Sequence, residues 1–226
     1  MLLTVVSLVR ELCRVRLSSI VLIGGLFSMD GSALAALAPP AMTLDGLGLR
    51  LPGWWLATIA YTVAWLGVMI VYTPFADRLA TRWVQKPPTL DSFRGLQQSR
   101  AKLILGIVVA WVLGGFLEEV VFRGIVLTTV ESMLAAQLIG PIASGAAVCV
   151  AALGAGLLHF YQGPRAMVIV TQLSVLFGVL FVVSGHNLWA VILCHGLYDT
   201  MAFVRFAKKK SKYSDLDGDG ASSGEE

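Results

Sequence analysis

The sequence predicts an all-α fold, a polytopic transmembrane helical bundle of about six spans, with roughly five to eight spans compatible with the pattern. Of 226 residues, 57% are hydrophobic and only 14% are charged, whereas soluble domains carry about 25% charged residues. The mean hydropathy is +0.78. We expect residues 1–210 to form a single integral-membrane domain and residues 211–226 to form a polar, disordered tail.

The first half of the chain contains two predicted spans and a basic loop. Residues 17–38 follow an arginine-containing segment and form the first span, which we expect to be retained rather than removed as a signal peptide. Residues 54–73 form the second span, with tryptophans at its start as interfacial anchors. Residues 77–102 hold 6 Lys or Arg side chains against 2 Asp side chains. This loop is therefore expected on the cytoplasmic side.

The apolar run over residues 103–137 is too long for a simple span. As one α-helix it would extend over roughly 52 Å, whereas the hydrocarbon core is about 30 Å thick. It is either a hairpin or one span with an extension. Three further apolar runs follow, at 142–158, 166–184 and 188–206, before the basic stretch at 208–210. Only the single-span choice leaves that stretch on the cytoplasmic side, so we predict one span here and both termini in the cytoplasm.

Several other functions are not indicated. The formal net charge is only +3, and the basic residues gather between apolar runs, so nucleic-acid binding is not expected. The three cysteines, Cys13, Cys149 and Cys194, lack the paired spacing of a disulfide framework or a cysteine metal site. Residues 215–226 match the spacing of an EF-hand loop, but no second helix follows in this sequence, so calcium binding is the less favoured interpretation.

The stretch FLEEVVFRG places three charged side chains inside the long apolar run. Charge at bilayer depth normally faces a protein interior or a wet cavity, so the stretch indicates a site. Glu119 and Arg123 are four residues apart, about 40° around a helix, which favours an ion pair that holds helices together. Glu118 points about 100° away from Glu119 and is not explained by that pair.

Two of the three histidines lie in apolar runs, His159 near the end of one and His195 in the last. His195 and Asp199 are four residues apart and share one helical face, so a plain helix contact would explain them alone. Together with Glu118, they can also form one site, because buried polar groups draw helices together. A carboxylate near an imidazole can activate water. Alternatively, Glu118, His159 and His195 could hold zinc or another divalent metal. Sequence alone leaves the metal-bound and metal-free options open.

Three motifs in order resemble the CPBP intramembrane proteases, also called Abi proteins, which include the type II CAAX prenyl endopeptidases. The resemblance covers roughly residues 43–206 and includes the flanking stretches GLGLRLP, HFYQG and NLWAVILCHGLYD. One position departs from the family pattern, because Ala155 stands where a phenylalanine is usual, and Phe160 is the candidate for the missing bulk. The motif residues are EExxxR as Glu118, Glu119 and Arg123, the histidine of FxxxH as His159, and HxxxN/D as His195 and Asp199.

The resemblance implies roles for these residues. Glu118 would be the general base, His159 would help it activate water, and His195 with Asp199 would lie near the scissile carbonyl. An ionised aspartate cannot donate to an oxyanion as asparagine can, so orientation of His195 is the favoured role of Asp199. Cys194 points about 100° away from His195, which disfavours a cysteine protease.

The resulting hypothesis is an integral-membrane endopeptidase of the cytoplasmic membrane that hydrolyses a peptide bond near a membrane face. Its substrate would be a peptide or protein, in some family members lipidated or membrane-tethered. The alternative is a non-enzymatic membrane partner or a bacteriocin self-immunity protein on the same scaffold, in which the polar groups only hold helices together. A proton-coupled transporter is the weakest alternative, because we see no internal repeat.

Overall fold

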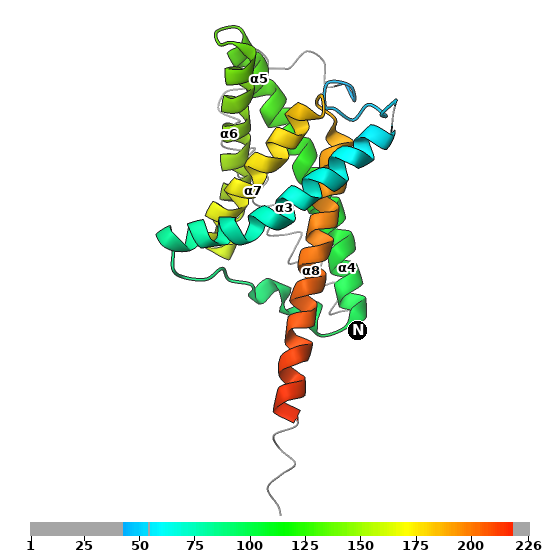
Figure 1. Ribbon diagram of the computed structural model, residues 1–226, viewed down its shortest axis with the longest axis vertical. Helices are drawn as coiled ribbons and strands as arrows, with labels where there is room; N and C mark the ends of the chain where they lie inside the picture. Colours follow the sequence, from blue (N-terminus) through cyan, green and yellow to red (C-terminus); the bar gives the residue numbers. More distant parts are fainter. Residues whose placement is uncertain (1–42, 54, 219–226) are drawn as a thin grey trace, which may run out of the picture.

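The computed structural model describes residues 43–53 and 55–218, and every regular element within these ranges is a helix. The predicted all-α fold is confirmed. Figure 1 shows long helices packed at varied angles, with α3 crossing in front of α7 and α8. In chain order the elements are α3 (Trp55–Trp83), η1 (Asp91–Gln97), α4 (Arg100–Ala110), η2 (Trp111–Glu118), η3 (Val120–Leu127), α5 (Thr128–Ala135), α6 (Gly140–Leu158), η4 (Phe160–Gln162), α7 (Pro164–Val183) and α8 (Leu188–Gly218).

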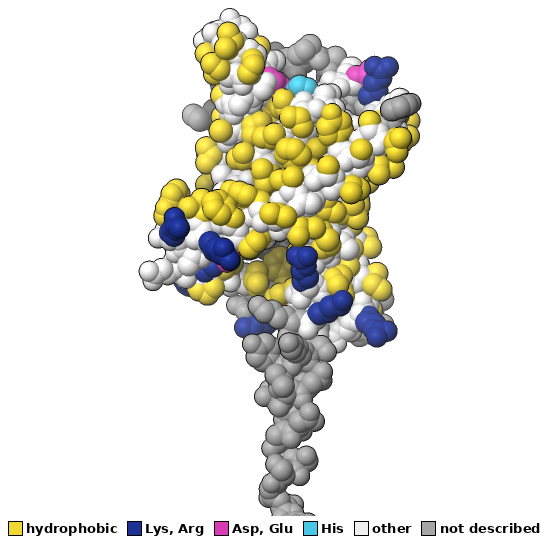
Figure 2. All heavy atoms as spheres, viewed as in Figure 1, with side chains coloured by type: hydrophobic (Ala, Val, Ile, Leu, Met, Phe, Trp, Pro, Cys, Tyr) yellow, Lys and Arg dark blue, Asp and Glu magenta, His cyan; other side chains and the backbone are white. Residues whose placement is uncertain are grey.

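Five helical segments are long and apolar enough to cross a membrane. They correspond to five of the six predicted spans, and the remaining prediction, residues 17–38, lies outside the described residues. The hydrophobic side chains that cover much of the visible face in Figure 2 fit this assignment, because a bilayer solvates apolar surface. The segments are Trp55–Trp83, Arg100–Ala135, Gly140–Leu158, Pro164–Val183 and Leu188–Lys208.

Helix α3 continues beyond the predicted span, through Pro74, and ends at Trp83. Proline removes one backbone hydrogen bond, but here the helix tolerates the loss. The extension includes Asp77, the first residue of the predicted basic loop at 77–102. The Asp77 carboxylate accepts from Nη2 of Arg165 on α7 at 2.7 Å. This ion pair gives the polar end of α3 a partner in the bundle.

The segment after α3 is partly folded rather than an open loop. The short 3-10 helix η1 buries Phe93 and Leu96 against the bundle. Nε2 of Gln97 donates to the carbonyl of Phe206 on α8 at 3.0 Å. Helix α4 then begins where the Ser99 hydroxyl accepts from the backbone N–H of Lys102, an ordinary N-cap.

Elements α4, η2, η3 and α5 form one continuous helix of 36 residues, Arg100–Ala135. This confirms the prediction of a single span with an extension and excludes the alternative, a hairpin. Its middle, η2 and η3, has π-helical turns, in which backbone hydrogen bonds reach five residues along the chain. Such turns are rare and occur frequently at functional sites. The three charged residues of FLEEVVFRG all lie in or between these turns.

Several hydrogen bonds hold the connection from α7 to α8. The side chain of Asn187 accepts from the backbone N–H of Trp189 at 3.1 Å, an ordinary helix N-cap. Gly48, with φ +73°, offers its carbonyl to the N–H of Leu188 at 2.9 Å. The loop before α3 is thereby tied to the start of α8. Helix α8 extends to Gly218, eight residues into the segment expected to be a disordered tail, and ends at a glycine.

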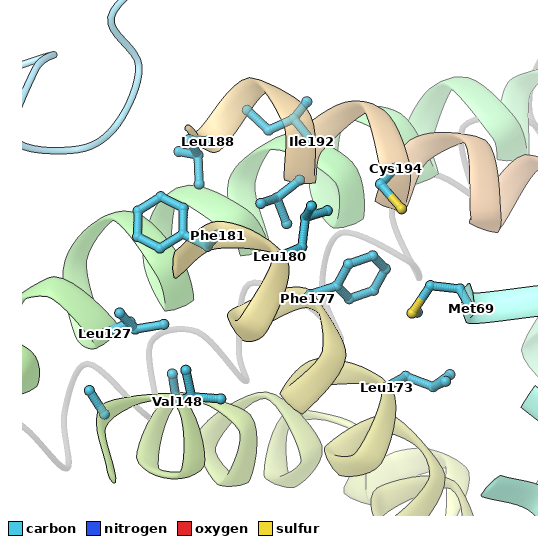
Figure 3. Packing of buried hydrophobic residues seen from close by; sticks show 13 residues of the cluster. Met69, Leu127, Val148, Leu173, Phe177, Leu180, Phe181, Leu188, Ile192 and Cys194 are labelled. Carbon is cyan, nitrogen blue, oxygen red and sulfur yellow. The ribbon is translucent and has the colours of Figure 1, made fainter. Parts of the chain in front are cut away.

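The apolar core is arranged around α7, which packs against α3, α6 and α8. Figure 3 shows Leu173, Phe177, Leu180 and Phe181 of α7 among apolar side chains from the neighbouring helices. Helix α7 thus contributes to the packing of three other long helices at once.

Candidate active site

The predicted ion pair between Glu119 and Arg123 is present and deeply buried. Nη1 of Arg123 donates to Oε1 of Glu119 at 3.1 Å, and these side chains are 2% and 0% exposed. The predicted ion pair is therefore confirmed. Arg123 also reaches α7, where its Nη2 donates to the carbonyl of Ser174 at 2.8 Å and to the hydroxyl of Ser174 at 2.7 Å. The guanidinium thus joins the long helix to α7.

His195 lies between two carboxylates. Its Nδ1 lies 2.5 Å from the same Oε1 of Glu119 that pairs with Arg123. Its Nε2 lies 3.6 Å from Oδ2 of Asp199, which is ion-pair distance but longer than a hydrogen bond. The hydrogen bond to Glu119 was not expected, and Asp199 remains a second carboxylate beside the ring. Because a carboxylate accepts, the proton of this pair lies on Nδ1, and Nε2 is the atom directed toward other groups.

A phenylalanine of α7 packs against both Arg123 and His195. The rings of Phe177 and His195 are stacked, with centroids 4.7 Å apart and planes at 21°. The guanidinium carbon of Arg123 lies over the same ring, 5.5 Å from its centroid. Glu119, Arg123, Phe177 and His195 are therefore one contiguous cluster from three helices.

Glu118 ends η2 and is 6% exposed. Its charge interacts electrostatically with those of Arg123 and His195. Glu118 is thus a second buried carboxylate beside the first, in an interior of low dielectric where charge interactions are strong.

His159 follows the last residue of α6, where the helix ends. Its Nδ1 lies 2.9 Å from the carbonyl of Ala155, and its ring is stacked with that of Tyr161 at a centroid distance of 6.0 Å. A carbonyl can only accept, so Nδ1 carries the proton and Nε2 has the lone pair. This is the tautomer that a base or a water-orienting group needs.

The wall beside Ala155 is filled by Phe122, not by Phe160. Phe160 is 56% exposed, so it does not supply the missing bulk. Phe122, on η3, is 1% exposed and packs with Ala155 and Leu158. A phenylalanine on a neighbouring helix therefore packs against the small side chain of Ala155.

A three-ligand metal site does not form among these side chains. Among the side chains that the structure describes, no three His, Cys, Asp or Glu residues lie close enough together to hold a metal ion. The set Glu118, His159 and His195, considered for zinc, does not meet that requirement. We therefore derive no step through a metal.

Cys194 is fully buried in the apolar core. His186 lies elsewhere, in the connection between α7 and α8, where its Nε2 lies 2.8 Å from Oε2 of Glu131 on α5. This contact ties the connection to α5.

A comparison with known families can now be set beside this geometry. Residues 100–201 match the family described as type II CAAX prenyl endopeptidase Rce1-like. The match covers just under half of the chain. The resemblance inferred from the three motifs is thus confirmed. The Rce1-like segment runs from the start of α4 into α8 and contains all six motif residues. No curated protein and no solved structure matches the chain.

Sequence reasoning missed three residues that pack against the motif residues or beside them, namely Phe122, Ser174 and Phe177. Two are phenylalanines in apolar helices, where such residues are ordinary core, so nothing in the sequence distinguishes them. Ser174 is a polar residue in the apolar α7 and was the one available signal.

Proposed function

We propose that this protein is an intramembrane endopeptidase that hydrolyses a peptide bond with a water activated by Glu118 and His159. The observation that carries the proposal is the fixed position of His195 in the Rce1-like segment. Its Nδ1 is bonded to a buried carboxylate, and one ring face is stacked on Phe177. A histidine that only joined two helices would not need both constraints.

The proposed reaction begins with proton transfer from a water molecule to Glu118, a buried carboxylate suited to a general base. The resulting hydroxide attacks the scissile carbonyl carbon and forms a tetrahedral oxyanion. Nε2 of His195, when protonated, donates to this oxyanion. Glu118 then returns its proton to the leaving amine, and the carbon–nitrogen bond breaks. Nε2 of His159 orients the water before attack.

The substrate we propose is a peptide or protein segment held at the membrane face, in its simplest form a lipidated or membrane-tethered chain. The proposed location is the cytoplasmic membrane, with both termini in the cytoplasm. In Figure 2 the Lys and Arg side chains lie mostly toward the end where α3 finishes and α4 begins, which supports this orientation.

The test is cleavage by purified protein in liposomes, with fluorogenic peptides that carry or lack a prenyl group. Glu118→Gln should reduce cleavage by roughly 100-fold or more, because a general base contributes about that much. Glu131→Gln is the matched control, because Glu131 contacts His186 and Ser144 and none of the six motif residues. Circular dichroism and thermal unfolding would check that both variants fold.

Wild-type cleavage by Glu118→Gln would refute the assignment of the base. A folded wild-type protein that cleaves neither peptide class would favour the alternative, a non-enzymatic partner or self-immunity protein. Cleavage of only the prenylated peptide would identify a lipidated substrate.

A further inference from the structure

Helix α7 holds no residue of the three motifs, yet it contacts two of them. Ser174 and Phe177 are three residues apart, so they lie on one face of the helix. Ser174 contacts Arg123 of the first motif, and Phe177 contacts His195 of the third. One face of α7 therefore links two motif residues that are 72 positions apart in the sequence (195 − 123).

The contact with Ser174 fixes the guanidinium of Arg123. Nη2 donates to two oxygens of Ser174, and Nη1 donates to Glu119. Arg123 is 2% exposed and Ser174 is 4% exposed, so water competes little for these bonds. Hydrogen bonds from a charged group are about twice as strong as neutral ones. The guanidinium in turn fixes the carboxylate that holds His195.

The contact with Phe177 fixes the plane of the His195 ring. A hydrogen bond at Nδ1 alone leaves the ring able to rotate about the line of that bond. Stacking at 4.7 Å with planes at 21° removes this freedom. The two contacts together determine where Nε2 points.

We infer that Ser174 and Phe177 are positioning residues, which set the direction of His195 Nε2 for the proposed hydrolysis. The inference rests on the proposed function for its catalytic part, and on the contacts above for its structural part. A misplacement of about 1 Å in a reacting group can cost roughly 100-fold in rate. Loss of the stacked ring should therefore reduce kcat by about tenfold to 100-fold while KM stays near its wild-type value.

The chain offers a matched control one turn further along α7. Phe181 is also fully buried, but its ring contacts His186 instead of His195. Phe177→Leu and Phe181→Leu each remove a buried aromatic ring from the same helix, so their effects on folding should be similar. Only Phe177→Leu should affect His195.

The first measurement does not depend on catalysis. Full-length protein with ¹⁵N-labelled imidazoles has three histidines, and single His→Gln variants assign them. Wild-type His195 should show one sharp set of ring signals, with a proton held on Nδ1 by Glu119. Phe177→Leu and Ser174→Ala should broaden these signals, because the ring then moves about its Nδ1 hydrogen bond, whereas Phe181→Leu should leave them sharp. Phe177→Tyr keeps the aromatic ring and Ser174→Thr keeps the hydroxyl, so both variants should retain the wild-type His195 signal.

The second measurement is kcat and KM for the same variants in liposomes. Unchanged His195 signals in folded Phe177→Leu and Ser174→Ala would overturn the inference, as would equal losses of kcat in Phe177→Leu and Phe181→Leu. If Phe177→Leu does not fold, Ser174→Ala decides the same question. A wild-type protein without cleavage would refute the proposed function alone, because the imidazole signals still test positioning.

Discussion

Oε1 of Glu119 lies 2.5 Å from Nδ1 of His195, and the same oxygen accepts from Arg123 at 3.1 Å. One carboxylate oxygen therefore serves a structural ion pair and a motif histidine at once. In the predicted arrangement Glu119 only neutralised Arg123. Its contact with His195 instead connects the first motif to the third, so stability and activity are coupled at this residue.

Removal of the carboxylate should strongly destabilise the protein. Glu119→Ala leaves the Arg123 guanidinium, 2% exposed, without its acid. Breaking a buried ion pair by removing one partner costs about 3–5 kcal/mol, so the free energy of unfolding should fall by about that amount. Denaturant titration in mixed micelles measures the change. A loss below about 1 kcal/mol would contradict the buried pair.

Removal of both charges should separate the two roles of Glu119. Replacing a buried ion pair by apolar residues of similar volume is often neutral or stabilising. Glu119→Leu combined with Arg123→Met should therefore unfold at about the wild-type denaturant concentration, while cleavage is lost because His195 has no acceptor. A stable double variant with wild-type cleavage would show that the bond to His195 is not needed.

Asp199→Asn should leave cleavage within about tenfold of wild type, whereas His195→Ala should lose roughly 100-fold or more. The carboxylate of Asp199 is 3.6 Å from Nε2 of His195, and Glu119 already holds the other nitrogen. Asparagine has the same shape and can also donate to an oxyanion. Initial cleavage rates of the two variants give the comparison. Equal losses of the cleavage rate would mean that Asp199, rather than Glu119, orients His195.

The sequence predicted contacts that depend on spacing within one helix. The Glu119–Arg123 pair, for example, follows from its four-residue spacing. It could not predict that His195 bonds to Glu119, because the two lie 76 positions apart and Asp199 offered a nearer carboxylate. The π-helical turns of η2 and η3 also depend on packing with neighbouring helices, for which a single sequence has no periodic signal.

Metal removal should leave cleavage unchanged. In the part of the chain whose side chains the structure describes, no three His, Cys, Asp or Glu residues are grouped closely enough to bind a metal ion, and a catalytic zinc site uses three protein ligands. Purified active protein should hold well below one zinc per chain by elemental analysis, and a chelator should not reduce its cleavage rate. Zinc at one per chain, with chelator-sensitive cleavage restored by zinc, would instead favour a metal held by residues that rearrange.

Close packing of η2 against α8 should make Gly196→Ala destabilising. A Cβ added at Gly196 on α8 would lie 2.5 Å from ring atoms of Trp111 on η2. Gly115 lies one turn further along η2, and a Cβ added there would meet the Gly196 backbone at 3.4 Å. The indole has little freedom to move, because its Nε1 donates to Thr200 at 3.0 Å. Small residues let membrane helices approach in this way. Overpacking typically costs about 1–3 kcal/mol.

Gly67→Ala is the matched control for this substitution. Gly67 lies within α3, and a Cβ there meets nothing within 4 Å. Alanine is favoured over glycine in a helix interior by up to about 1 kcal/mol, so Gly67→Ala should be neutral or stabilising. Gly196→Ala should also lower the cleavage rate, because Gly196 is adjacent to His195 and a displaced α8 would move the imidazole. Equal denaturation midpoints for the two variants would show that α8 does not pack on Trp111 as closely as described.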